Sequence, residues 1–337
     1  MEKIKNYGFT FFDTKIKRSS INPFSQMVDL YRVYRIQKEF NPDVLYNLGA
    51  KAIFYGTFVS KIQGRKRYIV NAPIGLGYVF SSKSMKAKLL RPLVLFCYRL
   101  CLNPTNSSVI IENFDDIDFF VKKGYLKPAN AFCILGAGVN TKKFRSIPFK
   151  QRNSMVTVVF AARLIEDKGV FDFVKLAERL YEKQIPVRMQ VVGEPDYGNP
   201  RSISHDDFEA LSKNPAIECL GFQPDMAPIL QKAHICCFPS FYREGLPRIL
   251  IEAASSGLAI ITTNTVGCKE VVRGGNGFLV SPHDISRMES LINYLIENPG
   301  ELQDMCVRSR QIAETYFDTQ LICERTYRII KKEGASV

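Results

Sequence analysis

The second half of the chain alternates short, β-rich apolar runs with amphipathic helical patterns, and this alternation limits the fold more than any other feature. The apolar runs occupy residues 157–164, 187–193, 216–222, 234–240, 258–264 and 278–282. Helical patterns separate them, and one follows the last run to about residue 297. Strand, helix and strand at this spacing are typical of a parallel sheet with helices on both faces. Right-handed crossovers then predict a doubly wound α/β domain.

The first half follows the same rhythm more loosely. Strands are expected at 8–12, 43–47, 67–71, 107–112 and 131–135, with helices at about 24–40, 50–63 and 85–101. A chain of 337 residues with 46% hydrophobic content can bury two cores of ordinary size. We therefore expect two domains, at 1–148 and 149–316, joined by a basic linker within 138–154. The C-terminal helix, at 317–337, is expected to pack back on the first domain.

Charge is divided unevenly between the halves. Residues 1–150 carry 25 Lys and Arg against 9 Asp and Glu, whereas residues 151–337 carry 21 against 24. A basic half suits nucleic acid, an anionic membrane surface or phosphorylated substrates. The aromatic and basic motifs of known nucleic-acid-binding modules are missing, so no nucleic-acid partner is expected. The basic apolar segment at 83–103 fits either a membrane interface or a core-facing helix, and the sequence leaves both interpretations open.

Residue usage also argues against a metal centre, a disulfide framework and a membrane span. The three histidines have no neighbour at metal-ligand spacing, and the nine cysteines form no C-x-x-C pair, as is typical of reduced cytosolic thiols. Asp116 and Asp118 lie at the start of an expected helix, where acidic residues favour the first turn, so no metal site is assigned to them. The longest apolar stretch, 89–103, is too short to cross a bilayer.

The sharpest local motif is EGLPRILIE, in which Glu244 and Glu252 flank a Gly-Leu-Pro turn. Pro247 suits the first turn of a helix, and Gly257 suits its end. Glu244 then lies before a helix whose free N–H groups, at 245–248, suit a phosphate or a polar sugar edge. Glu252, about a turn and a half inside, can reach paired ribose hydroxyls. The alternative interpretation is a helix cap followed by a surface carboxylate.

A second motif, ARLIEDKG at 162–169, follows an apolar run that ends a strand. Arg163 and Lys168 leave the same strand-to-helix loop, where a guanidinium and an ammonium can bracket a diphosphate. Taken alone, the two residues are interpreted as surface cations. If they lie beside the N-terminus of a helix that follows a later strand of the same sheet, the three groups together can bind a phosphate.

These motifs resemble, in order and spacing, the donor domain of family-four retaining glycosyltransferases. The resemblance is carried by ARLIEDKGV, VVGEPDYGNP, CLGF, FPSFYREGLPRILIEAASSG, ITTNTVGCKEVV and NGFLV, and it covers nearly all of 150–317. PDVLYNLGAKAIFYG, GLGYVF, ENFDDIDFF and LGAGVNTKKF extend it into the first half. Within the family, the chain looks most like bacterial enzymes that add a sugar to a lipid-linked carrier. The resemblance implies a GT-B fold, with two Rossmann-like domains facing a cleft.

The resemblance also implies residue roles. Arg163 and Lys168 match the diphosphate-binding pair, and Glu244 matches the carboxylate that contacts the donor sugar. Glu252 matches the carboxylate that binds the ribose. Gly245, Leu246 and Pro247 match the turn whose backbone lies against the sugar and phosphates. Gly193, Gly221 and Phe222 match the walls of the pocket that binds the nucleotide base. Cations and N–H groups at these positions would stabilise the leaving nucleoside diphosphate without a metal.

The first half departs from the family pattern in two places. Family members usually begin with an apolar strand, a glycine-rich turn and a helix, and the opening MEKIKNYGFTFFDTK contains no such unit. Either the true start lies upstream of Met1, or the first domain lacks its opening strand. Many relatives also place a histidine near the reacting centre, where this chain has NAPIGLGYVF. Its Gly75 and Gly77 permit close backbone approach to a ligand, so a backbone-lined acceptor side or phosphate loop is expected.

The function implied by the resemblance is retaining transfer of a hexose or N-acetylhexosamine from a nucleoside diphosphate sugar, expected to be a UDP-sugar. The acceptor is expected to be a lipid-linked saccharide in polysaccharide biosynthesis of the O-antigen or capsule type. No cofactor besides this donor substrate is expected. The enzyme is expected to be cytoplasmic and peripheral, on the anionic inner face of the cytoplasmic membrane. The alternative is a degenerate, non-catalytic protein that binds a nucleotide-sugar.

Overall fold

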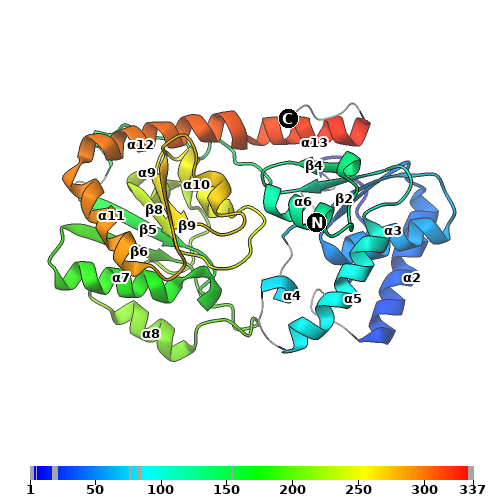
Figure 1. Ribbon diagram of the computed structural model, residues 1–337, viewed down its shortest axis with the longest axis horizontal. Coiled ribbons are helices and arrows are strands. Elements are labelled where there is room, and N and C mark those ends of the chain that lie inside the picture. The colour runs from blue at the N-terminus through cyan, green and yellow to red at the C-terminus, as the bar shows by residue number, and fades with distance from the viewer. Residues whose placement is uncertain are drawn as a thin grey trace.

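The computed structural model of the chain describes residues 4, 6–16, 22–75, 78–81, 85–152 and 155–332. Its two parallel sheets, of four and six strands, belong to two α/β units that lie side by side (Figure 1). A long helical segment, coloured orange to red, runs along both units (Figure 1). This is the architecture of two Rossmann-like domains that the sequence predicts. Among the described residues, no helix has both the length and the apolar character needed to cross a membrane.

The first sheet has the order β1-β2-β3-β4, with all strands parallel. The strands are β1 (Val44–Leu48), β2 (Tyr68–Ala72), β3 (Ser107–Ile111) and β4 (Ala131–Cys133). The helices are α2 (Pro23–Phe40), α3 (Ala50–Ile62), α4 (Tyr78–Ser81), α5 (Met85–Cys101) and α6 (Phe114–Lys122). Ile53, Tyr98 and Phe120, from α3, α5 and α6, pack with strand residues into one core. The strands and helices predicted between residues 24 and 135 are therefore confirmed, to within a few residues at their ends.

The predicted strand at 8–12 is wrong, because these residues have no regular structure beyond a turn. The side chain of Phe9 is largely exposed, whereas Phe12 packs edge-on against Phe40, at 6.0 Å between ring centres. A β-rich run forms a strand only where a neighbouring strand supplies hydrogen-bond partners, and no strand of the described residues pairs with this run. Within the described part of the chain, the first sheet begins at Val44.

The second sheet has the order β10-β9-β8-β5-β6-β7. Its strands are β5 (Val156–Ala161), β6 (Val187–Val192), β7 (Glu218–Cys219), β8 (Ile235–Phe238), β9 (Ala259–Thr263) and β10 (Gly277–Val280). The helices are α7 (Val170–Glu182), α8 (His205–Lys213), α9 (Ala227–Lys232), α10 (Arg248–Ser255), α11 (Ile285–Glu297) and α12 (Pro299–Ile312). The strand order reverses between β5 and β8, which is where doubly wound sheets bind ligands, beyond the carboxyl ends of the strands. Loops that follow β5 and β8 therefore define the candidate site.

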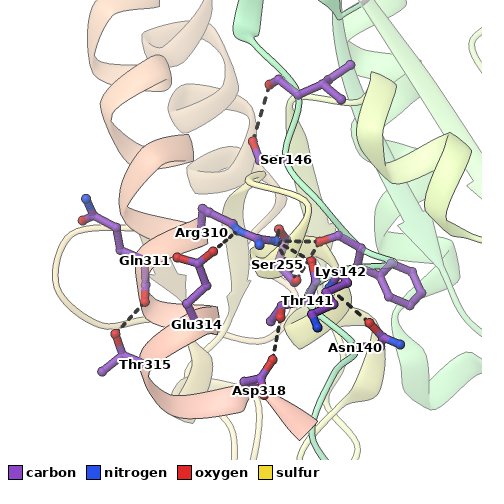
Figure 2. A network of polar contacts seen from close by, with 12 residues as sticks. Asn140, Thr141, Lys142, Ser146, Ser255, Arg310, Gln311, Glu314, Thr315 and Asp318 are labelled. Atoms are coloured by element: carbon purple, nitrogen blue, oxygen red, sulfur yellow. Dashed lines mark hydrogen bonds and ion pairs between the residues drawn. The ribbon is translucent and has the colours of Figure 1, made fainter. Parts of the chain in front are cut away.

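The C-terminal segment crosses from the second sheet to the first. After α12, the chain passes Asp318 and enters α13 (Thr319–Lys331). The crossing is fixed by Arg310, whose guanidinium donates to the carbonyl oxygens of Thr141, Phe144 and Ser255 (Figure 2). The α13 helix then covers the face of the first sheet that lies opposite α3, α5 and α6, where Ile322 and Ile329 pack with residues of β2 and β3.

Candidate donor site between the two domains

The loop after β5 and the loop after β8 bring Lys168 and Glu244 together. The Lys168 ammonium forms an ion pair with the Glu244 carboxylate, and both side chains are largely buried. The ammonium also lies 5.3 Å from the centre of the Tyr242 ring, a cation–π contact. Ser240 donates a 3.3 Å hydrogen bond to the same Glu244 oxygen. A cation and a carboxylate are thus held in fixed positions at the switch point of the sheet.

Arg163 lies between two hollows of the site. The first hollow, of about 320 Å³, is lined by Lys168, Glu244 and Arg163, together with the predicted residues Gly75, Gly245 and Leu246. The second, of about 440 Å³, is lined by Arg163, Gly193, Phe222 and Glu252. The guanidinium pairs with Asp196, and its side chain is 58% exposed. It is therefore accessible to a ligand that extends from one hollow into the other.

Helix α10 places Glu252 in the second hollow. Pro247 directly precedes the helix and accepts the Leu250 N–H at 3.1 Å, as expected of a proline at a helix start. Glu252 lies one turn further along, where it accepts a 2.7 Å hydrogen bond from the Arg248 Nε. Burial raises the pKa of the Glu252 carboxyl above its ordinary value, and the Arg248 guanidinium opposes that shift. A buried, singly paired carboxylate of this kind retains acceptor capacity for ligand hydroxyls.

Two predicted residues shape the second hollow through their backbone. Gly193 has φ +136°, and a Cβ there would lie 1.8 Å from the carbonyl oxygen of Ala162, so only glycine fits between β5 and β6. Its N–H donates a 2.8 Å bond to the carbonyl of Gly221, which therefore supports the wall without lining it. Phe222 is 65% exposed at the rim, available for stacking against a flat ring.

Not every predicted site residue lines a hollow. Pro247 is at the helix start and contacts neither hollow directly. Gly77 lies outside the described residues. Gly75, in contrast, faces the donor domain, because a Cβ built on it would lie 3.2 Å from the backbone nitrogen of Gly245. The first domain thus approaches the turn after Glu244 through the backbone of Gly75. The ligand contact expected of Gly75 and Gly77 stays a prediction.

Glu112 is a site residue that the sequence reasoning missed. It directly follows β3 and lines the first hollow with Glu244 and Lys168. Burial raises the pKa of its carboxyl to about 7; a hydrogen bond from the Leu246 N–H opposes this shift, and the nearby acids Asp116 and Glu244 add to it. The signal in the sequence is a carboxylate at the carboxyl end of an apolar run, within the segment ENFDDIDFF.

The acidic residues after Glu112 connect the two domains. Asp116 accepts a 2.9 Å bond from the Nε of Arg243, and Asp115 accepts one of 2.9 Å from Lys269. Asp118 pairs instead with Lys122, one turn along α6, at 2.7 Å. Asp116 and Asp118 therefore point to different partners. No group of three or more His, Cys, Asp or Glu within the described ranges is arranged to hold a metal ion.

Comparison with models of protein families assigns the chain to a known family. Residues 139–312, slightly more than half of the chain, match the family described as glycosyl transferases group 1. The chain belongs to this family. The matched region contains Arg163, Lys168, Glu244 and Glu252, so both hollows of this glycosyltransferase lie largely within it.

Similar proteins extend this likeness over most of the glycosyltransferase. The N,N'-diacetylbacillosaminyl-diphospho-undecaprenol alpha-1,3-N-acetylgalactosaminyltransferase of Campylobacter jejuni is 24% identical, over 97% of this chain and 87% of its own length. The capsular polysaccharide biosynthesis glycosyltransferase CapM of Staphylococcus aureus is 23% identical, over 96% and 85%. Anabaena HepE, solved in complex with UDP, superposes with a TM-score of 0.74 at 20% identity, covering 90% of this chain and 82% of its own. The structural likeness shows the GT-B fold.

Proposed function

We propose that this glycosyltransferase moves a hexose or N-acetylhexosamine, with retention of configuration, from a UDP-sugar to a lipid-linked saccharide during O-antigen or capsule type polysaccharide assembly. The observation that carries the proposal is the meeting of Arg163, Lys168 and Glu244 at the switch point of the donor sheet. They lie beside the turn at 245–247, and the family resemblance implies that this turn contacts sugar and phosphates.

The two hollows fit the two ends of a nucleotide-sugar. Each lies in the size range of small-molecule sites, about 300–1,000 Å³. Glu252 and Phe222 suit the ribose and base, whereas Lys168 and Glu244 suit the phosphate and sugar. Arg163, which lines both, suits the diphosphate between them. HepE, solved with UDP, supports the choice of base. Negative charge grows on the leaving UDP as the glycosidic bond breaks, and fixed cations stabilise it, so no metal is needed for this role.

The names of the relatives support the proposal that the acceptor is a lipid-linked saccharide. The Campylobacter relative acts on a sugar attached to diphospho-undecaprenol, and CapM acts in capsular polysaccharide biosynthesis. A lipid-linked acceptor stays in its bilayer, so the enzyme must work at a membrane surface. We therefore place it on the cytoplasmic face of the membrane as a peripheral protein.

Helix α5 supplies a surface that suits this location. Its inner side is buried through Ala87, Tyr98 and Cys101. Its outer side presents five apolar side chains, each 50% to 81% exposed: Met85, Leu89, Leu93, Phe96 and Leu100. At about 100° per residue these five fall within a sector of about 80° around the helix axis. The inner side of the helix therefore packs in the core, and its exposed apolar side supports the proposed contact with a membrane interface.

Charge favours an anionic bilayer over a second copy of the chain as the partner of this surface. Residues 44–111, which include α3 and α5, contain ten Lys and Arg and no Asp or Glu. Lys88 and Arg99 are exposed beside the apolar sector. A symmetric dimer through this face would place cations against cations, whereas each Lys or Arg near an anionic lipid surface contributes about 1 kcal/mol.

Turnover tests the activity. Wild-type protein is expected to release UDP from a matching UDP-sugar only when a polyprenyl-diphosphate-linked saccharide is present, and Glu244→Gln is expected to abolish this release. NMR of the product is expected to show the anomeric configuration of the donor. Binding of UDP-sugars without turnover on any lipid-linked acceptor would instead support the non-catalytic alternative.

Vesicle flotation tests whether the exposed apolar side of α5 binds a membrane. Wild-type protein is expected to float with phosphatidylcholine vesicles that contain phosphatidylglycerol, and less with pure phosphatidylcholine. The triple variant Leu89→Ser, Leu93→Ser, Phe96→Ser is expected to lose this binding. Tyr181→Ser with Val307→Ser, at positions of the donor domain that are 58% and 50% exposed, is the control and is expected to float like wild type. Unchanged flotation of the triple variant would contradict the assignment of this surface.

A further inference from the structure

Glu112 reaches from the first domain to the turn that follows Glu244. Its carboxyl accepts a hydrogen bond from the backbone N–H of Leu246. A Cβ built on Gly245 would lie 1.9 Å from the Glu112 Oε2, so the glycine leaves the room that this carboxyl occupies. The family resemblance places the same turn against the donor sugar. A sugar that contacts the turn therefore also lies next to Glu112.

The surroundings of Glu112 are acidic, unlike those of Glu244. Glu244 is neutralised by Lys168. The nearby charges that shift the pKa of Glu112 are those of Asp116 and Glu244, both acids. The hollow is also lined by four cations, but each pairs with another carboxylate: Arg163 with Asp196, Lys168 with Glu244, Arg243 with Asp116 and Arg248 with Glu252. A carboxyl in this setting is a poor site for an anion and a good site for hydroxyl groups, which donate to carboxylate oxygens.

We propose that Glu112 binds the donor sugar opposite Glu244, and that these two carboxyls, one from each domain, select a neutral sugar over a hexuronate. The inference rests on the proposed function, because it takes the turn at 245–247 as the sugar-binding turn. A neutral hexose offers hydroxyls to both carboxyls. The carboxylate of a hexuronate would bring a further negative charge next to the Glu112 carboxyl, and like-charge contacts are a means by which sites reject a competing ligand.

The protonation of Glu112 provides an independent readout. Burial raises its pKa to about 7, so its negative charge appears as the pH rises through neutrality. Rejection of a hexuronate is therefore expected to strengthen from about pH 6 to about pH 8. Among the described residues, the other titratable or charged groups that face Glu112 or line its hollow are Tyr46, Asp116, Arg163, Lys168, Tyr242, Arg243, Glu244 and Arg248.

Calorimetric titration of UDP, UDP-glucose and UDP-glucuronic acid tests the inference, because the two sugars differ only at C6. We expect wild-type protein to bind UDP-glucuronic acid at least about tenfold more weakly than UDP-glucose at pH 8. Glu112→Gln keeps the shape and the acceptor oxygen but removes the charge. It is expected to lower that ratio about fivefold or more, to remove its rise with pH, and to leave the Kd for UDP within about twofold.

Asp118→Asn is the matched control. It removes the same charge from the same segment, but at an exposed acid that pairs with Lys122 away from the hollow. We expect its three Kd values and their pH dependence to equal those of wild type. Thermal unfolding of both variants checks that they are folded.

The outcomes separate this inference from the proposed function. An unchanged ratio in Glu112→Gln would overturn the inference while leaving the transferase proposal intact. An equal loss of UDP and UDP-glucose binding in that variant would also overturn it, because it would make Glu112 a support of the turn alone. Wild-type protein that binds none of the three nucleotides would overturn both.

Discussion

Lys168 and Glu244 are 76 positions apart in the chain and form an ion pair in the structure. Their contact follows from topology, because β5 and β8 are adjacent strands on either side of the point where the strand order reverses. The loops beyond their carboxyl ends therefore meet. Without a ligand, Glu244 neutralises the cation that the proposed donor would approach with its phosphates.

Removal of the Lys168 charge is expected to slow transfer. Lys168→Ala should lower kcat about 100-fold to 1,000-fold, the usual cost of losing one group that stabilises charge in the transition state. The rate of UDP release with the lipid-linked acceptor measures it. Lys183→Ala is the control, because Lys183, directly after α7, also pairs with a glutamate, Glu289 of α11, outside the site. Equal rates for the two variants would remove Lys168 from the proposed site.

Alanine substitutions of Arg163 and of its ion-pair partner Asp196 are expected to have different effects on the affinity for UDP. Arg163→Ala should weaken UDP binding about tenfold or more, because a guanidinium held near a diphosphate makes strong charge-assisted hydrogen bonds. Asp196→Ala should leave the affinity unchanged or improve it, because the Arg163 guanidinium then has no competing carboxylate. Calorimetry with UDP at low and high salt measures both. Weaker binding in Asp196→Ala would mean that the pair acts as a unit.

The ribose contact expected of Glu252 can be isolated with a modified nucleotide. Glu252→Ala should weaken UDP binding about tenfold, whereas it should change the binding of 2',3'-dideoxy-UDP little, because that ligand lacks the hydroxyls. The coupling between the residue change and the ligand change is the quantity to measure. Arg248→Ala serves as the control for the loss of the 2.7 Å contact within α10. Equal losses for both nucleotides would assign Glu252 a structural role.

Much of the fold follows from local sequence. The α5 helix has the predicted bounds, 85–101, because helical periodicity and end signals are local. The strand expected at 8–12 fails for the opposite reason, since a strand needs a partner that its own sequence cannot specify.

The same distinction separates the site residues. Arg163, Lys168 and Glu244 lie in motifs at strand ends, and the parallel order of the sheet brings such ends together, so their proximity was predictable. The position of Glu112 was not, because it depends on how the first sheet faces the second across the cleft. That relation is set by contacts such as Arg243 with Asp116, whose partners are 127 positions apart. The roles of these residues stay predictions.

The hydrogen bonds of Arg310, which hold the C-terminal segment where it crosses between the domains, are expected to contribute to the free energy of unfolding. Arg310→Ala would leave the carbonyls of Thr141, Phe144 and Ser255 without this donor, at a cost of about 3 kcal/mol in the free energy of unfolding. Urea denaturation measures the change. Arg308→Ala, two residues away, removes a single 3.3 Å bond to the Gly275 carbonyl at an exposed site and should cost less than about 1 kcal/mol. Similar costs for both would contradict the role given to Arg310.

His234 is expected to make the protein less stable in mild acid. Its ring is buried, its Nδ1 accepts the Thr157 N–H at 3.1 Å, and the Phe149 ring packs on it at 5.0 Å. Burial, helped by the charge of Arg152, lowers the pKa of His234 from 6.5 to about 4. Between these values the unfolded chain binds a proton that the folded protein excludes. Stability from this group is therefore present above about pH 6.5 and is lost progressively as the pH falls toward 4.

The expected loss is about 2 kcal/mol in the free energy of unfolding at about pH 5 relative to neutral pH. His234→Asn keeps an acceptor near the Thr157 N–H but does not titrate in this range, so the pH profile of the variant should be flatter by that amount. His205→Asn, at an exposed position of α8, should keep the wild-type slope. Urea denaturation across this pH range measures all three proteins, and parallel profiles for wild type and His234→Asn would show that the ring is not held neutral by burial.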